Sequence, residues 1–326
     1  PFGGYGPSFV NPKTGQILGA DIMLEYVYFT NRVKYEQLHR TFNSDSGFNS
    51  EPVNTCLAAD YLHQGNLFGM ATLPAVDDFS QLEQHRLIYE SLVKLTLHEV
   101  GHTLGLNHNF YASHLHSFKN IHNRIITEPV GLTSSVMDYV TVNVNDKPKH
   151  HGQFYSTTPG PYDIWAIEFG YTPPSESTTD EKERIELLLS QSTKNELRFG
   201  NDADDMRSPG RGIDPRINTY DMSTNPIAYA KQRMDVVRSL YPELKERYER
   251  TGESYHAFTD AFSILNREYS NSAMVISRYV GGVFMDRSLV GQKGINKPFV
   301  PVPKDKQKWA MTLLGKYIFA PNAFET

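Results

Sequence analysis

Residues 98–108 read HEVGHTLGLNH, and this stretch holds the side chains best suited to chemistry in the chain. His98 and His102 are four residues apart, so on a helix their imidazoles leave the same face one turn apart. Both can then reach one metal ion at about 2.0–2.1 Å, the usual zinc–nitrogen distance. Glu99 is rotated by about 100° from His98 around the helix, which puts its carboxylate beside the ion rather than on it.

A third imidazole, from His108, can reach the same ion only if the helix ends before it. Gly105 tolerates a positive φ, so it allows the chain to turn sharply at that point. We therefore predict His98, His102 and His108 as the ligands of one Zn²⁺ ion. Three protein ligands leave a fourth position open for water, which is typical of a catalytic rather than a structural zinc.

The helix that must carry these residues is predicted from Leu82 to Leu104, a range without proline. Its apolar residues form two stripes, which are Leu82, Tyr89, Val93, Leu97, Val100 and Leu104 for the first and Ile88, Leu92 and Leu95 for the second. The line of the second stripe continues into Glu99 and His102. We expect the first stripe to pack on a sheet and the second to run under a cleft.

Other potential ligands are less specific. Further histidines occur at His114, His116, His122, His150 and His151, and we interpret them as solvated loop residues. Residues 200–224 are rich in acidic side chains, namely Asp202, Asp204, Asp205, Asp214 and Asp221. Closely spaced oxygen ligands suit Ca²⁺, but no calcium-loop pattern is present, so a solvated acidic loop is the default interpretation.

Downstream of this motif, Ser135-Val136-Met137-Asp138-Tyr139 resembles the Met-turn of the metzincin clan of zinc peptidases. In that clan the methionine packs beneath the three imidazoles as a soft floor, and the resemblance gives Met137 this place. Tyr139 matches a tyrosine that in some metzincins ligates zinc or hydrogen-bonds the developing oxyanion. The alternative is a buried tyrosine whose hydroxyl is satisfied elsewhere.

Two further sequence stretches narrow the resemblance from the clan to one family within it. Residues 160–171 read as a short helix, with Pro161 in its first turn and Gly170 as its C-terminal stop. Together with NPKTGQIL at residues 11–18, they resemble the bacterial Met-zincin family of large secreted or periplasmic zinc peptidases. The resemblance is specific over residues 1–172, weaker beyond, and implies a periplasmic or extracellular location. Asn109 is not diagnostic of the better-studied subfamilies, so no substrate preference follows.

Composition agrees with a folded enzyme. The 326 residues, 39% of them hydrophobic, suffice for two domains or one large domain with an extension. The net charge of −5 is mild and no Lys/Arg cluster occurs, which argues against a nucleic-acid or membrane-surface partner. No apolar run approaches the roughly 20 residues of a membrane span. Cys56 is the single cysteine, so no internal disulfide can form, and we interpret it as a small core residue.

We predict an α+β fold, with a metzincin-like catalytic domain over residues 1–172 and a mainly α-helical extension over residues 173–326. The first would contain a small mixed sheet, the active-site helix and the Met-turn. Strands are expected at Ile17–Phe29 and Leu67–Leu73, and residues 110–160 are expected to be loop-rich. A metzincin usually has several strands before its active-site helix, so we expect an upstream part of the same polypeptide to complete the sheet.

The second half begins with a change of composition. Residues 173–179, PPSESTT, indicate a linker, and a capped helix is predicted to start near Asp180. Helical periodicity dominates from Asn225 to Gly282, with a break expected at Pro242. A last helix is predicted between Lys304 and Phe319.

The resemblance implies hydrolysis of peptide bonds in a polypeptide substrate, and we expect an endopeptidase. Zinc lowers the pKa of its bound water and polarises the scissile carbonyl, while Glu99 accepts the water's proton and delivers it to the leaving amine. Since the three histidines must be neutral to bind, activity should fall as the pH drops through the histidine range. Two alternatives stay open. One is a non-catalytic zinc-containing module with a fourth ligand from residues 110–122, and the other is a zinc hydrolase acting on a non-peptide substrate.

Overall fold

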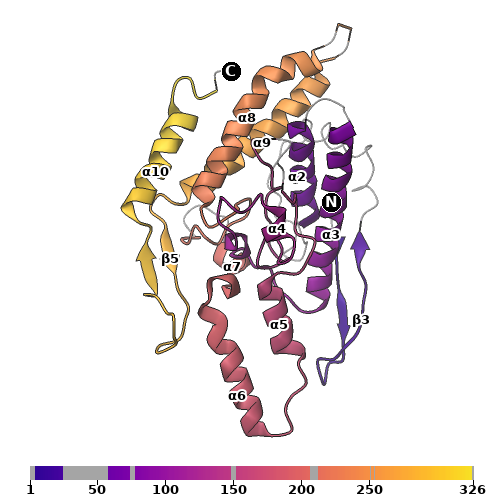
Figure 1. The fold of residues 1–326 in the computed structure, drawn as a ribbon, viewed down its shortest axis with the longest axis vertical. Coiled ribbons are helices and arrows are strands. Elements are labelled where there is room, and N and C mark those ends of the chain that lie inside the picture. The colour runs from indigo at the N-terminus through magenta and orange to yellow at the C-terminus, as the bar shows by residue number, and fades with distance from the viewer. Residues whose placement is uncertain are drawn as a thin grey trace.

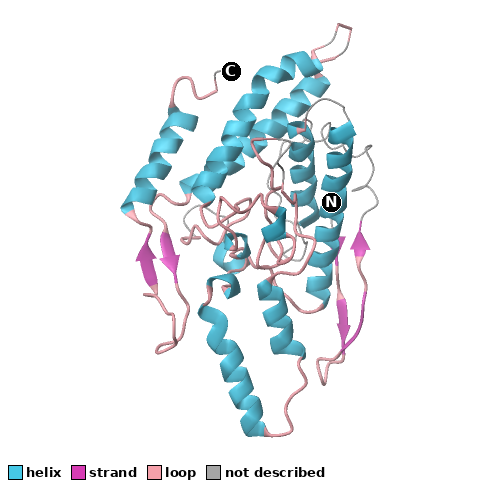
Figure 2. Cartoon of the chain, viewed as in Figure 1, coloured by secondary structure: helices cyan, strands magenta, loops and turns pink. Residues whose placement is uncertain are grey.

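The computed structural model describes residues 4–24, 58–73, 78–147, 152–205, 212–249, 251–252 and 254–324. Helices form most of the regular structure, and the strands pair in three two-stranded antiparallel sheets (Figure 2). The architecture is therefore α+β with small sheets, as predicted. Within the described ranges no strand joins a larger mixed sheet, so that finer part of the prediction has no counterpart there.

Most of the chain's regular elements are named in Figure 1. The strands are β1 (Gly4–Tyr5), β2 (Ser8–Val10), β3 (Ile17–Ala20), β4 (Met23–Leu24), β5 (Val283–Met285) and β6 (Phe299–Pro301). The α-helices are α2 (Ala58–Thr72), α3 (Asp78–Thr103), α4 (Arg124–Thr127), α5 (Pro161–Tyr171), α6 (Thr178–Leu189), α7 (Asp202–Asp205), α8 (Pro226–Tyr248), α9 (His256–Ser277) and α10 (Lys304–Leu314). Short 3₁₀ turns lie at Ala112–His114, Ser190–Thr193 and Asn195–Leu197, and a π-helical turn at Gly315–Phe319 continues α10.

The N-terminal strands form one interrupted hairpin that lies alongside α3 (Figure 1). β1 pairs with β4 and β2 pairs with β3. Between these pairs Gly6 packs against α3 so closely that an added Cβ would lie 2.5 Å from the carbonyl oxygen of Glu99. The strand predicted at 17–29 is present as β3 and β4, and its part beyond residue 24 lies outside the described residues, as does Cys56.

Helix α2 occupies the place of the strand predicted at Leu67–Leu73, so that prediction is wrong. Its buried side chains lie on several sides, and they include Tyr61, Leu62, Asn66, Leu67 and Phe68. A helix that is covered all round has no single apolar face, and a short apolar run in it resembles a buried strand. α2 packs against α3 and α9, which makes it an inner layer of the molecule.

Helix α3 is present over the predicted range and starts four residues earlier, but its faces differ from the prediction. Leu82 and Tyr89 of the first apolar stripe are 65% and 64% exposed, so no sheet covers them among the described elements. The buried face is largely polar and consists of Glu83, Leu87, Glu90, Ser91, Lys94, Leu95, His98 and Glu99. This face is polar because a folded loop packs against it, and the backbone N–H and C=O groups of that loop need hydrogen-bond partners.

The described parts of that loop are residues 104–147 and 152–160. They contain little regular structure, as predicted for residues 110–160, yet much of their surface is buried. A buried backbone without a helix or sheet must find other hydrogen-bond partners. The Asn143 amide donates to the carbonyls of Ile121 and Gln153 at 3.0 and 2.8 Å. The Glu90 carboxylate of α3 accepts the N–H groups of Phe154 and Tyr155 at 2.5 and 3.1 Å. Side chains thus satisfy backbone hydrogen-bonding groups of this loop that neighbouring strands would satisfy in a sheet.

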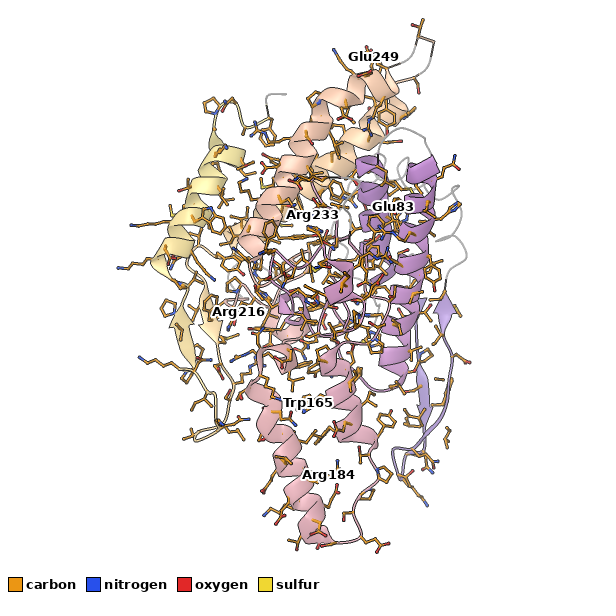
Figure 3. All side chains as sticks on the ribbon, in the orientation of Figure 1. Glu83, Trp165, Arg184, Arg216, Arg233 and Glu249 are labelled. Atoms are coloured by element: carbon orange, nitrogen blue, oxygen red, sulfur yellow. The ribbon has the colours of Figure 1, made fainter. Side chains whose placement is uncertain are left out.

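The long helices α8 and α9 pack side by side (Figure 1). The break predicted at Pro242 is wrong, because α8 continues through it to Tyr248. Proline removes one backbone hydrogen bond from a helix, but α8 packs against α9, and the ring of Tyr241 next to this position lies 5.6 Å from that of Phe262 on α9. Arg233 of α8, labelled in Figure 3, faces inward and pairs with Glu268 of α9.

One cluster of buried apolar side chains runs through both halves of the chain. It includes residues of α2 and α3, of the loop after α3, and of α8, α9 and α10. β5 and β6 add a strand pair to the half predicted to be mainly helical. The domain boundary at residues 172 and 173 stays a prediction, and the two halves share this core.

Two peripheral helices follow the loop. α5 starts at Pro161 as predicted, but it ends at Tyr171, so Gly170 lies inside it rather than stopping it. α6 is the capped helix expected after the linker, and the Ser177 side chain accepts the Asp180 N–H at its start. The Trp165 indole of α5 donates to the carbonyl of Leu188 at 3.0 Å and ties the two helices together (Figure 3).

Candidate metal centre

Three imidazoles come together where α3 ends. One ring nitrogen from each of His98, His102 and His108 lies within 4.8 Å of the other two. His98 and His102 are one turn apart on α3, with ring centroids 4.8 Å apart, and His108 lies 4.9 Å from His102. Among the described residues, this is the one group of three histidine, cysteine or acidic side chains whose ligand atoms are close enough to share a metal ion.

The sharp turn that brings His108 back is a Schellman motif. Leu106 N–H donates to the carbonyl of Gly101 at 3.0 Å, and Gly105 N–H donates to that of His102 at 2.9 Å. Gly105 has a φ of +88°, a conformation that side chains with a Cβ rarely adopt. The predicted role of Gly105 as a turn residue therefore has its geometric counterpart.

The two helical imidazoles are each oriented by a backbone carbonyl. Nδ1 of His98 lies 2.8 Å from the carbonyl oxygen of Val136, and Nδ1 of His102 lies 3.1 Å from that of Leu106. A carbonyl oxygen only accepts, so both Nδ1 atoms carry the proton. The lone pair of each neutral ring is then on Nε2, the atom left to bind a metal.

The site fits a zinc ion on two grounds. Nε2 of His98 is fully buried and has no hydrogen-bond partner in the protein, which is costly unless a ligand satisfies it. Burial, followed by the neighbouring Lys94 ammonium, holds the pKa of His98 well below its ordinary value, and burial also lowers that of His102. Neutral imidazoles are the form that binds Zn²⁺.

Glu99 lies next to the first imidazole and is fully buried. Its position on α3 puts it on the helix face that includes His98 and the buried polar residues. The backbone of the N-terminal hairpin at Gly6 lies against its carbonyl, which contributes to this burial. Glu99 thus adjoins the first imidazole in the chain and is buried, while its role as a general base stays a prediction.

Met137, which the resemblance places beneath the imidazoles, is fully buried. Its sulfur packs against Gly101 of α3, where an added Cβ would lie 2.3 Å from it. Glycine inside a helix costs roughly 0.5–1 kcal/mol relative to alanine, so its presence at 101 marks this close approach. The sequence showed an interior glycine, but it did not show that the Met-turn fills the space.

Tyr139 packs its ring among the site's aromatic side chains. The ring centroid lies 4.6 Å from that of His108 and 4.8 Å from that of Tyr61. Its hydroxyl lies 2.8 Å from Nε2 of His108, on the side of that ring where a metal would bind. The hydroxyl therefore contacts one of the three imidazoles, and its role toward a metal or an oxyanion stays a prediction.

The segment predicted to be the Met-turn, residues 135–139, is held by residues that the sequence analysis did not single out. Asp163 of α5 accepts from the Ser135 hydroxyl at 2.5 Å and from the N–H groups of Val136 and Gly160 at 2.8 Å each. Lys94 donates to the carbonyl of Val136 at 2.6 Å, the same carbonyl that orients His98. Two features of the sequence could have indicated these residues. They are a lysine one turn before His98 on the predicted helix and an acidic residue in the first turn of the helix that begins at Pro161.

The histidines predicted to be solvated are mostly buried, which corrects that prediction. His114 and His116 are 6% and 7% exposed, and His122 is half-buried. His116 Nε2 lies 2.7 Å from the carbonyl of Gly131, and His114 lies 3.4 Å from buried Asp221. Neither belongs to the metal group, so the described residues give no support to a fourth ligand from 110–122. His150 and His151 lie outside the described residues.

The acidic residues of 202–221 do not form one solvated loop. Asp204 pairs with Arg287, and Asp214 pairs with Arg216, which also bonds the carbonyl of Met285 (Figure 3). Buried Asp214 also accepts the N–H of Met285, so the pair anchors β5. The calcium site stays a prediction without a geometric counterpart among the described carboxylates.

Asp202 has a different partner from the other acidic residues. Its carboxylate lies 2.7 Å from Nδ1 of His108, so a residue of the C-terminal half contacts a predicted metal ligand. The side chain of Asp202 was predicted only as part of an acidic segment. No sequence spacing indicated this contact, because 94 positions separate the two residues.

A family model described as Met-zincin matches residues 80–326. The chain belongs to the Met-zincin family. The match confirms the family and extends through the C-terminal half, where the sequence motifs were weakest. It begins at residue 80, so the part of the resemblance that rests on residues 11–18 stays a prediction. No curated protein and no solved structure matches the chain.

Membership in the Met-zincin family gives the three imidazoles a context. Zinc peptidase chemistry is what the family description suggests, and the His98, His102 and His108 group supplies a place to hold the metal. Among the helices that the structure describes, none is both long and apolar enough to cross a membrane.

Proposed function

We propose that this Met-zincin is a zinc-dependent peptidase that cleaves polypeptide substrates internally. The observation that carries the proposal is the convergence of three imidazoles, with Glu99 next to the first of them on the same helix. Three protein ligands leave room for a water and a substrate oxygen, the pattern of catalytic rather than structural zinc sites.

The chain's own groups have distinct tasks in this reaction. His98, His102 and His108 would hold the zinc ion, which would polarise the scissile carbonyl and lower the pKa of a bound water. Glu99 accepts a proton from the attacking water and passes it to the leaving amine. Tyr139, whose hydroxyl lies 2.8 Å from Nε2 of His108, donates a hydrogen bond to the oxyanion that develops on the carbonyl. Met137, packed against Gly101 of α3, would support the imidazoles from below, as the resemblance implies.

Cleavage-site profiling on a denatured proteome, with and without a zinc chelator, tests this function. We expect chelator-sensitive internal cleavage by the wild-type protein. Loss of cleavage with zinc still bound is expected for Glu99→Ala, by about 10²–10⁴-fold, because only the base is removed. The exposed histidine His85 of α3 offers a control, and His85→Ala should cleave and bind zinc as the wild type does.

The outcomes separate the candidate functions. A fully active Glu99→Ala variant would refute the proposed base. A zinc-loaded wild type that cleaves no polypeptide would contradict the peptidase, and a screen of acetylated and glycan substrates would then test the non-peptide alternative.

We also propose that the protein works in the periplasm or outside the cell. The support is the resemblance to secreted and periplasmic Met-zincins. Fractionation of cells that produce the full-length protein tests this location, and retention in the cytoplasm would contradict it.

A further inference from the structure

The third imidazole differs from the other two in what orients it. His98 and His102 sit on α3, and both are fixed by backbone carbonyls. His108 lies beyond the helix end, and its Nδ1 is fixed by a side chain, the carboxylate of Asp202 at 2.7 Å. A ring outside a helix has fewer local restraints on its orientation. The contact with Asp202 therefore contributes more to the orientation of His108 than the carbonyl contacts contribute to that of His98 and His102.

Asp202 is held in place from two directions. On one side, the segment before it pairs with the backbone after His108, since Phe110 N–H donates to the carbonyl of Gly200 at 2.7 Å. Gly200 N–H in turn donates to the Asn109 side chain at 3.1 Å. The carboxylate therefore arrives at His108 on a backbone that is already tied to the metal-binding turn.

On the other side, the next turn of chain is tied to the C-terminal half. Buried Asp204 of α7 pairs with Arg287, which follows β5. The Asp204 carboxylate also accepts the Asn201 N–H at 3.1 Å and closes the start of α7. Asp202 itself is 61% exposed, yet the residues around it fix its position.

The chemistry of the contact suits a metal ligand. A carboxylate that accepts the Nδ1 proton of an imidazole fixes the tautomer with its lone pair on Nε2 and makes that nitrogen more basic. Such partners of metal-binding histidines typically contribute about 10–100-fold to metal affinity. Neutral carbonyl partners, as at His98 and His102, orient their rings without this charge.

We propose that Asp202 is a positioning residue for His108, through which the C-terminal half completes the metal centre. The inference rests on the proposed metal site but not on peptide hydrolysis. Asp202 touches neither the ion nor a substrate, and it acts through the imidazole alone.

The test is the zinc dissociation constant of the full chain, measured by competition with a chromogenic chelator. We expect Asp202→Ala to raise the dissociation constant by about 10–100-fold. Asp202→Asn keeps an acceptor oxygen but loses the charge, so we expect a smaller rise. The matched control is Asp180→Asn, which removes one exposed negative charge on α6 and should leave the affinity unchanged.

A second readout reports geometry rather than affinity. The visible spectrum of the Co²⁺-substituted protein depends on the arrangement of ligands, so Asp202→Ala should change its band positions or intensities, whereas Asp180→Asn should not. The unfolding midpoint of each metal-free variant shows whether the fold is retained, and Asp202→Asn decides the matter if Asp202→Ala does not fold.

Two results would overturn the proposal. One is a dissociation constant within twofold of wild type for the folded Asp202 variants. The other is an equal rise for Asp202→Asn and Asp180→Asn, which would indicate a general effect of charge. If neither the wild type nor any variant cleaves peptides while the expected differences in zinc affinity are observed, the result counts against the proposed function and not against this proposal.

Discussion

The loop region, whose described parts are residues 104–147 and 152–160, and the helix pair α8–α9 are both largely buried, but different interactions hold them together. In the loop region, buried polar side chains bond to the backbone, as Glu90 does to Phe154 and Tyr155. In the helix pair, the contacts are mostly between apolar side chains such as Val237 and Leu265.

The difference follows from backbone hydrogen bonding. A helix bonds its own N–H and C=O groups, so its side chains are left to pack, whereas a buried loop leaves these groups to other partners. Helix α3 supplies several such partners, which explains why its buried face is polar and its apolar residues Leu82 and Tyr89 are exposed.

An exception within the helix pair supports this interpretation. Buried Arg233 pairs with Glu268, and it also donates to the carbonyl of Val142 at 2.5 Å, which belongs to the loop region. The buried charge thus occurs where the helices meet the loop. The lesson is that the loop region depends on specific polar groups, while the helix pair depends on filled volume.

Removal of Asp163 should break the loop region most severely. Asp163→Ala removes the acceptor of the Val136 and Gly160 N–H groups and of the Ser135 hydroxyl. Each buried donor left unbonded costs about 1–3 kcal/mol, so we expect a loss of roughly 3–5 kcal/mol in the free energy of unfolding. Urea unfolding of the metal-free protein measures it. Asp163→Asn, which keeps one acceptor oxygen, should lose less, and equal losses would contradict the hydrogen-bond account.

A cavity in the helix pair should cost somewhat less and leave the metal centre intact. Leu265 of α9 is 1% exposed, and Leu265→Ala is expected to lower the free energy of unfolding by about 2–5 kcal/mol. Leu265→Met, which nearly conserves volume, is the control and should lose under about 1.5 kcal/mol. Zinc affinity should be that of the wild type in both, and a weaker affinity would show that the two regions are not separable.

The pH dependence of stability offers a sharper comparison. Burial first, and the Asp221 carboxylate second, hold the pKa of Asp138 in the Met-turn well above its ordinary value of about 3.9. The native state then binds more protons than the unfolded state between about pH 4 and the raised pKa. The contribution of Asp138 to stability is full below this range and is lost as the pH rises through it.

Asp138→Asn resembles the protonated carboxyl and cannot lose its proton. Its free energy of unfolding should therefore rise relative to the wild type as the pH rises from about 4 toward 7. Parallel urea titrations at several pH values measure the difference. The Leu265→Ala variant should show no such trend, and identical pH slopes for Asp138→Asn and wild type would contradict the assignment.

The smallest effect is expected at the periphery, where neither region is involved. Ser177 caps α6 by accepting the Asp180 N–H, so Ser177→Ala should cost about 0.5–2 kcal/mol without changing zinc affinity. Ser177→Asp, a residue equally suited to capping, should restore most of the loss. A drop in zinc affinity would show that α6 supports the metal centre.

The site was predictable as far as its determinants are local. His98, His102 and Gly105 lie on one helix and its terminal turn, so spacing alone gives their geometry. The place of Met137 beneath the imidazoles is implied by the resemblance and stays a prediction, while its contact with Gly101 of α3 is observed. The contact between Asp202 and His108 could not be predicted, because it joins elements that only the complete fold brings together.

The fold was predictable where an element carries its own start signal or a long helical periodicity. Helices α5 and α6 follow from Pro161 and from the cap before Asp180, and α9 lies within the helical periodicity predicted from Asn225 to Gly282. The end of α2 was predicted as a strand because this helix is covered on several sides and its apolar run has no helical period. A break was predicted at Pro242 because proline locally destabilises a helix, and the sequence does not show the tertiary packing that compensates for this cost. The buried polar face of α3 needs the loop against it to be understood.

Zinc K-edge X-ray absorption of the purified wild-type protein tests the central claim most directly. The account predicts one zinc per chain with three imidazole nitrogens at about 2.0–2.1 Å and an oxygen in the remaining position. In His102→Ala the imidazole signal should fall, whereas in His85→Ala it should not change. A fourth protein ligand in the wild type, or the absence of stoichiometric zinc, would contradict the account.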